Sequence, residues 1–176
     1  IVAILISIYV SVNGKLSEVP KYFTYWILIT YIIYGLIILC GYNNSTFFST
    51  MWTLSFIAFI GVIVVLTYNA SMKDKMFDSK FYTDFRTSIV TSVFNHVIPL
   101  LFLILTFGFP KVYPSIGFII AFILIYILFT YWYTDSGPPS QYNLPESIGS
   151  YSCIIFVTAI CIGIVIKIAD RNKKKI

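Results

Sequence analysis

The segment VYPSIGFIIAFILIYILFTYWYT, residues 112–134, decides the fold class, because it holds no charged side chain and is long enough to cross a bilayer. Backbone groups cannot stay unpaired in lipid, so such a run is expected to be a helix, and it lacks the alternation of a membrane β-strand. Five further apolar runs flank it, at residues 1–12, 22–41, 48–68, 87–108 and 148–168. We therefore predict an all-α integral membrane protein, a single domain over residues 1–176 with about six transmembrane helices. The run 1–12 is short for a span, so the first helix is expected to be truncated.

The composition agrees with this prediction. Hydrophobic residues make up 59% of the 176 residues and charged residues only 11%, whereas soluble domains carry about 25% charged residues. Much of the net charge of +5 comes from a basic cluster at the C-terminus, formed by Lys167, Arg171, Lys173, Lys174 and Lys175. A nucleic-acid site would need a basic face with aromatic or polar readers, so a juxtamembrane tail beside membrane lipids is the simpler interpretation.

The same cluster bears on orientation and location. With six spans both termini lie on one side, and the dense basic cluster favours a cytosolic C-terminus. Lys173 and Lys174 stand fourth and third from the end, which resembles the dilysine retrieval motif of endoplasmic-reticulum membrane proteins. The alternative is an ordinary basic anchor after a span. We expect a multi-pass protein of the endomembrane system, in the endoplasmic reticulum.

The three cysteines, Cys40, Cys153 and Cys161, lie inside apolar runs and lack metal-ligand spacing. We expect them to be small buried hydrophobic residues. No disulfide framework, metal site or other cofactor is predicted.

His96, the single histidine, lies about ten residues into the run 87–108. Ionisable groups inside a membrane are costly and are candidate functional residues. Ser88, Thr91 and Ser92 precede it at offsets of eight, five and four residues, which gives this helix a polar stripe, and Pro99 removes a backbone donor just after it. The alternative is a structural histidine that bonds a neighbouring helix.

One histidine without a carboxylate inside a span suits neither a metal site nor a proton relay, but a general base beside a hydroxyl nucleophile needs only one imidazole. The runs 22–41 and 87–108 enter the membrane from the same side, so Thr24 and His96 are expected in the same half of the bundle. Thr24 is thus a candidate nucleophile and His96 its base, with Asn95 and Ser92 as candidate oxyanion or supporting groups. The alternative for Thr24 is an interfacial residue bonded to its own backbone.

These residues resemble a family, the androgen-induced and androgen-dependent multi-pass membrane hydrolases. The segment from Lys21 to Trp26 is similar to the K-Y-[LM]-T motif that opens one of the family's helices. Further similar segments follow in the family's order: Tyr68-Asn69, Met76-Phe77, Asn95-His96 before Val97-Ile98-Pro99-Leu100, and Tyr113-Pro114-Ser115. The resemblance covers most of the chain and implies six spans. It also implies hydrolysis of fatty acid esters of hydroxy fatty acids by a Thr nucleophile and a His, at the positions of Thr24 and His96.

Two segments depart from the family pattern. The family's catalytic His stands five residues before the proline, whereas His96 stands three before Pro99. The G-x-W-x-Y-P segment is replaced by Gly137-Pro138-Pro139-Ser140-Gln141-Tyr142. The departures favour the alternative function, a non-catalytic lipid-binding or regulatory multi-pass membrane protein.

Overall fold

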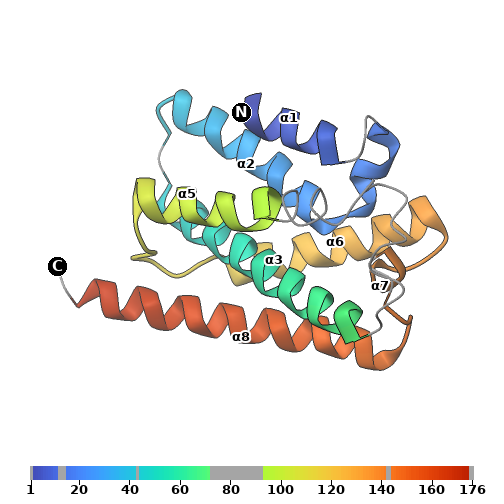
Figure 1. Cartoon of the computed structure of the whole chain (residues 1–176). Helices are drawn as coiled ribbons and strands as arrows, with labels where there is room; N and C mark the ends of the chain where they lie inside the picture. Colours follow the sequence, from blue (N-terminus) through green and yellow to red (C-terminus); the bar gives the residue numbers. More distant parts are fainter. Residues whose placement is uncertain (1, 12–14, 43, 72–92, 142–143, 175–176) are drawn as a thin grey trace.

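The computed structural model describes residues 2–11, 15–42, 44–71, 93–141 and 144–174, and the regular structure within these ranges is helical throughout (Figure 1). The elements are α1 (Val2–Ser11), η1 (Leu16–Lys21), α2 (Phe23–Leu39), α3 (Ser45–Ser71), η2 (Val93–Val97), α5 (Ile98–Phe107), α6 (Ile116–Thr134), α7 (Pro138–Gln141) and α8 (Ile148–Lys173). The predicted all-helical class is confirmed for these residues.

Three of the described helices are long and apolar enough to cross a membrane, over Ser45–Val65, Ile116–Thr134 and Ile148–Lys173. Two shorter apolar helices cover Phe23–Leu39 and Asn95–Phe107. The outer faces of α6 and α8 carry large exposed apolar side chains, such as Leu128 and Phe156, which are 68% and 66% exposed. Lipid is the environment that such faces require, so the chain has the structure of a helical membrane protein. The expected number of six spans stays a prediction.

Helix boundaries follow capping residues rather than hydropathy alone. The backbone N–H of Phe47 donates to Asn44 Oδ1, so α3 begins at Ser45, ahead of the apolar run that starts at residue 48. Ser115 and Ser147 cap α6 and α8 in the same way, by accepting the backbone N–H of the residue three positions later.

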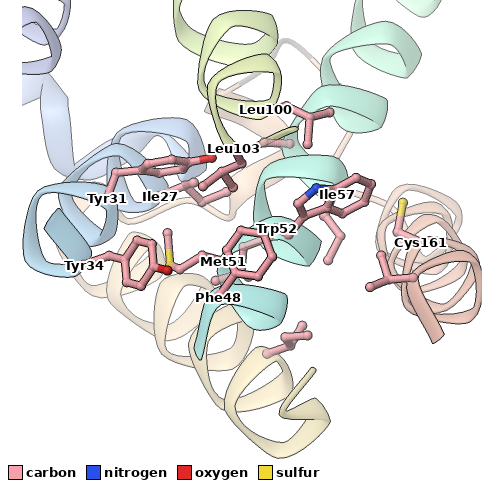
Figure 2. Packing of buried hydrophobic residues seen from close by; sticks show 14 residues of the cluster. Ile27, Tyr31, Tyr34, Phe48, Met51, Trp52, Ile57, Leu100, Leu103 and Cys161 are labelled. Atoms are coloured by element: carbon pink, nitrogen blue, oxygen red, sulfur yellow. The ribbon is translucent and has the colours of Figure 1, made fainter. Parts of the chain in front are cut away.

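Helix α3 is the centre of the bundle and contacts α2, α5, α6 and α8 (Figure 1). Its Met51 and Leu54 are fully buried in a cluster that Figure 2 shows between residues of α2, α5 and α8. Several hydroxyls on α3 are buried as well. Thr50 and Thr53 each donate to the carbonyl four residues earlier, which satisfies the hydroxyl inside the core.

Helix α8 packs on α3 through small side chains at a spacing of four residues. Cys161, Val165 and Ala169 are fully buried, and the first two belong to the cluster around α3. Cys40 and Cys153 are exposed instead, so the expectation of three buried cysteines is wrong for two of them. Cys153 lies on an exposed face of α8, and Cys40 is the residue just after the end of α2, neither of which membership of an apolar run specifies.

Candidate functional site

Thr24 and His96 meet across the bundle, at the end where α2 begins. Thr24 Oγ1 and His96 Nε2 are 2.7 Å apart, although 72 residues separate them in the chain. Thr24 is 6% exposed, and the hydrogen bond is partly buried. The two residues that the sequence placed in the same half of the membrane are therefore direct hydrogen-bond partners.

Thr24 differs from four other buried threonines of the described helices in where its hydroxyl points. Thr30 and Thr130, like Thr50 and Thr53, donate to the carbonyl four residues earlier in their own helix. For Thr24 that carbonyl belongs to Pro20, which precedes the helix and accepts the indole N–H of Trp26 at 2.9 Å. Because Thr24 lies in the first turn of α2, its hydroxyl is directed to another helix instead of its own backbone.

The start of α2 is fixed by aromatic donors that hold η1. Tyr126 Oη donates to the carbonyl of Lys21 at 2.8 Å, and Tyr133 Oη donates to the carbonyl of Ser17 at 3.0 Å. The Trp26 ring packs edge-on against Tyr126, with ring centroids 5.7 Å apart. Helix α6 thereby sets the position of the turn that carries Thr24.

His96 lies in η2, which is a π-helix from Val93 to Val97. Pro99 follows at the second position of α5 and has no N–H with which to continue a regular α-helical ladder. A π-helix closes its hydrogen bonds over five residues instead of four, so it rotates the side chains before it relative to those after it. Such turns are frequent at functional sites. The direction of His96 toward Thr24 thus depends on this break in the helix.

Helix α1 lies beside both elements of the site. It contacts α2 and η2, and its Ile8 is buried against Tyr25 and Leu28 of α2. The contact places an apolar helix next to the Thr24–His96 pair.

The other candidate residues have different outcomes. Asn95 is 5% exposed and directly precedes His96. Ser92, Ser88, Thr91 and the Met76-Phe77 segment lie outside the described residues. Gly137–Gln141 includes the short helix α7, which lies at the end of the bundle where α2 begins, and the N–H of Gly137 donates to the Glu146 carboxylate (Figure 1).

The sequence interpretation missed Tyr31, whose hydroxyl contacts both Ser55 and the carbonyl of Pro99. A signal was present, since Tyr31 stands seven residues after Thr24 and so shares its face of the helix. The partners of Tyr31 could not be read from that spacing, because Ser55 and Pro99 come from other helices.

The Thr24 hydroxyl and the His96 imidazole have the chemistry of a nucleophile and a general base. When the imidazole proton is on Nδ1, Nε2 accepts the hydrogen bond from the Thr24 hydroxyl. A neutral imidazole at this distance can take the hydroxyl proton as the oxygen attacks an electrophile. Comparison of the chain with protein-family models, curated proteins and solved structures found no match.

Proposed function

We propose that this protein is an intramembrane lipid-ester hydrolase in which Thr24 is the nucleophile and His96 the general base. The observation that carries the proposal is the 2.7 Å contact between Thr24 Oγ1 and His96 Nε2. An alkyl hydroxyl is a weak nucleophile unless a base takes its proton, and a base within hydrogen-bond distance supplies that requirement. Apolar helices around the pair suit a lipid substrate.

The proposed reaction has two halves. Thr24 Oγ1 attacks the ester carbonyl carbon while His96 Nε2 takes the hydroxyl proton. The tetrahedral intermediate then expels the alcohol, which leaves with that proton, and an acyl-Thr24 ester remains. Water attacks the acyl carbon with His96 again as base, and the carboxylic acid departs as Thr24 regains its proton. Water is the only co-reactant, and no cofactor takes part.

Two features would stabilise the negative charge that develops. Thr24 lies in the first turn of α2, where the helix dipole places partial positive charge that favours an alkoxide. Asn95, buried next to His96, is our candidate side-chain donor to the oxyanion. The first turn of α2 contains Thr24, and Asn95 directly precedes His96.

The substrate class rests on the resemblance to the androgen-induced and androgen-dependent hydrolases, and we propose fatty acid esters of hydroxy fatty acids. Such a substrate would reach the site laterally through the bilayer. We place the protein in the endomembrane system with the basic end of α8, which carries the exposed Lys173 and Lys174, in the cytosol. Membrane lipids are its proposed partners.

The test compares variants in membranes for labelling by a fluorophosphonate probe and for hydrolysis of a fatty acid ester of a hydroxy fatty acid. Thr24→Ala and His96→Ala should each lower hydrolysis by about 10³-fold or more and abolish labelling. Thr30→Ala is the matched control, since Thr30 is a buried threonine of the same helix that bonds its own backbone. It should keep both activities.

Equal labelling of wild type and Thr24→Ala by the fluorophosphonate probe would contradict the proposed function. The outcome would favour the alternative, a non-catalytic lipid-binding membrane protein, which predicts thermal stabilisation by the ester without turnover.

A further inference from the structure

Tyr31 is a buried tyrosine whose hydroxyl joins three helices. Its Oη lies 2.7 Å from Ser55 Oγ of α3 and donates to the carbonyl of Pro99 in α5 at 3.0 Å. The residue itself is 7% exposed. In Figure 2 the Tyr31 ring lies across the space between α2 and α5, with its oxygen toward Leu103.

Tyr31 and Thr24 act on the same neighbouring segment. Seven residues separate them on α2, close to two full turns, so they share one face of the helix. Thr24 contacts His96, and Tyr31 contacts Pro99, three residues further along that segment. Helix α2 therefore holds the segment at two points.

The second point lies at the junction between the π-helix η2 and α5. Pro99 has no N–H, so the regular ladder of hydrogen bonds is interrupted there and does not by itself fix how η2 continues into α5. A bond from outside the segment supplies that restraint. Ser55 holds Tyr31 from the central helix, because its hydroxyl can donate to Tyr31 Oη while Tyr31 donates to Pro99, and the carbonyl of Met51 at 2.7 Å is its alternative acceptor.

We propose that Tyr31 is a positioning residue, whose hydroxyl holds the η2–α5 junction so that His96 Nε2 stays within hydrogen-bond distance of Thr24 Oγ1. The inference rests on the proposed hydrolase function for its kinetic consequence. Its structural consequence, the placement of His96, does not need catalysis.

Removal of the Tyr31 hydroxyl separates positioning from packing. Tyr31→Phe keeps the ring in the core and leaves Ser55 bonded to Met51, so the fold should persist. Tyr34→Phe is the matched control, because Tyr34 is a buried tyrosine of the same helix, 3% exposed, whose ring packs on Phe47 and Phe107. Both variants lose one phenolic oxygen from α2.

We expect Tyr31→Phe to lower kcat by roughly 10- to 100-fold with KM within about twofold, since small misplacements of a catalytic group have effects of this size. Tyr34→Phe should change neither constant more than about twofold. A fall in kcat matched by Tyr34→Phe, or one that follows a loss of folded protein, would overturn the positioning role.

A second readout is independent of turnover. The chain has a single histidine, so protein with ¹⁵N-labelled histidine gives one set of imidazole resonances. Tyr31→Phe should move the Nε2 resonance in the direction that Thr24→Ala moves it, and Tyr34→Phe should leave it in place. An unmoved Nε2 resonance in Tyr31→Phe would refute the positioning role. If the fluorophosphonate probe does not label wild type more strongly than Thr24→Ala, the hydrolase proposal is refuted instead.

Discussion

The contact of α3 with α8 and the contact of α2 with the η2–α5 segment are built from opposite kinds of side chain. Helix α8 presents Cys161, Val165 and Ala169, all fully buried, to the centre of the bundle. Helix α2 presents Thr24 and Tyr31, whose hydroxyls bond to His96 and Pro99. On the α8 side the first contact is made by side chains that form no hydrogen bond across it, whereas the second contact is organised around hydrogen bonds between helices.

The difference indicates that the contact of α3 with α8 stabilises the bundle, whereas the contact of α2 with the η2–α5 segment forms the candidate site. Small side chains let membrane helices approach closely, and the resulting van der Waals contact holds them together without polar groups. Hydrogen bonds between membrane helices add only about 0.6 kcal/mol on average. The fold therefore gains little stability from the polar pair at α2, which agrees with the chemical role proposed for that pair.

Pro99→Ala should break the polar contact with the largest effect. The new N–H would let a regular α-helix run through residues 95–99 and would turn His96 away from Thr24. We expect hydrolysis to fall by about 100-fold, or about 2.7 kcal/mol in the activation barrier, with a thermal midpoint equal to or above that of wild type.

Kinetics and thermal unfolding of Pro99→Ala and Pro145→Ala check this prediction. Pro145 is an exposed proline ahead of α8, so its replacement should leave hydrolysis unchanged. Wild-type kcat in Pro99→Ala would show that the break in the helix does not direct His96.

Ala169→Leu should break the apolar contact instead. Ala169 continues the buried face of α8 that carries Cys161 and Val165 and is itself fully buried, so a larger side chain there should cost about 1–3 kcal/mol of stability through overpacking. Activity per folded molecule should stay the same, because α8 supplies neither reacting group.

Thermal unfolding in detergent and the specific activity of the folded fraction measure both effects. Gly163→Leu is the control on the same helix, since Gly163 has open space around the position of a Cβ. Lost activity at full stability in Ala169→Leu would contradict this division between fold and site.

Tyr113→Phe should have the smallest effect on stability and activity. It tests whether a polar contact away from the candidate site affects activity. Tyr113 Oη donates to Asp170 Oδ1 at 2.6 Å, and Lys173 Nζ lies 3.5 Å from the centre of the Tyr113 ring. Because the contact is exposed, its loss should lower the thermal midpoint by only about 1 °C and leave kcat unchanged.

The pH dependence of this contact has a definite sign. The hydrogen bond to the Asp170 carboxylate raises the pKa of Tyr113 above its ordinary 10.0. The stabilisation is therefore complete below pH 10 and is lost as the pH rises through the elevated pKa. Thermal midpoints of wild type and Tyr113→Phe should converge in that alkaline range, with Tyr42→Phe, an exposed tyrosine, as control. A constant difference across it would contradict the assignment.

The sequence by itself determined the class of protein and predicted that two of its polar residues lie in the same half of the bundle. Uncharged runs as long as residues 112–134 can only be helices in lipid, because every backbone group must be paired there. Distance along such a run converts directly into depth, at about 1.5 Å per residue. That conversion was enough to put Thr24 and His96 in the same half of the bundle.

Only the tertiary structure decided that the two residues face each other. Each residue turns the helix by about 100°, so one inserted residue redirects a side chain without changing its depth appreciably. The π-helix before Pro99 is such an insertion, and the hold of Tyr31 on Pro99 joins residues 68 apart in the chain. The same limit explains why Cys153, on α8, proved exposed. The position of a residue along a span follows from the sequence of that span. The direction of its side chain depends on how the helices pack against one another.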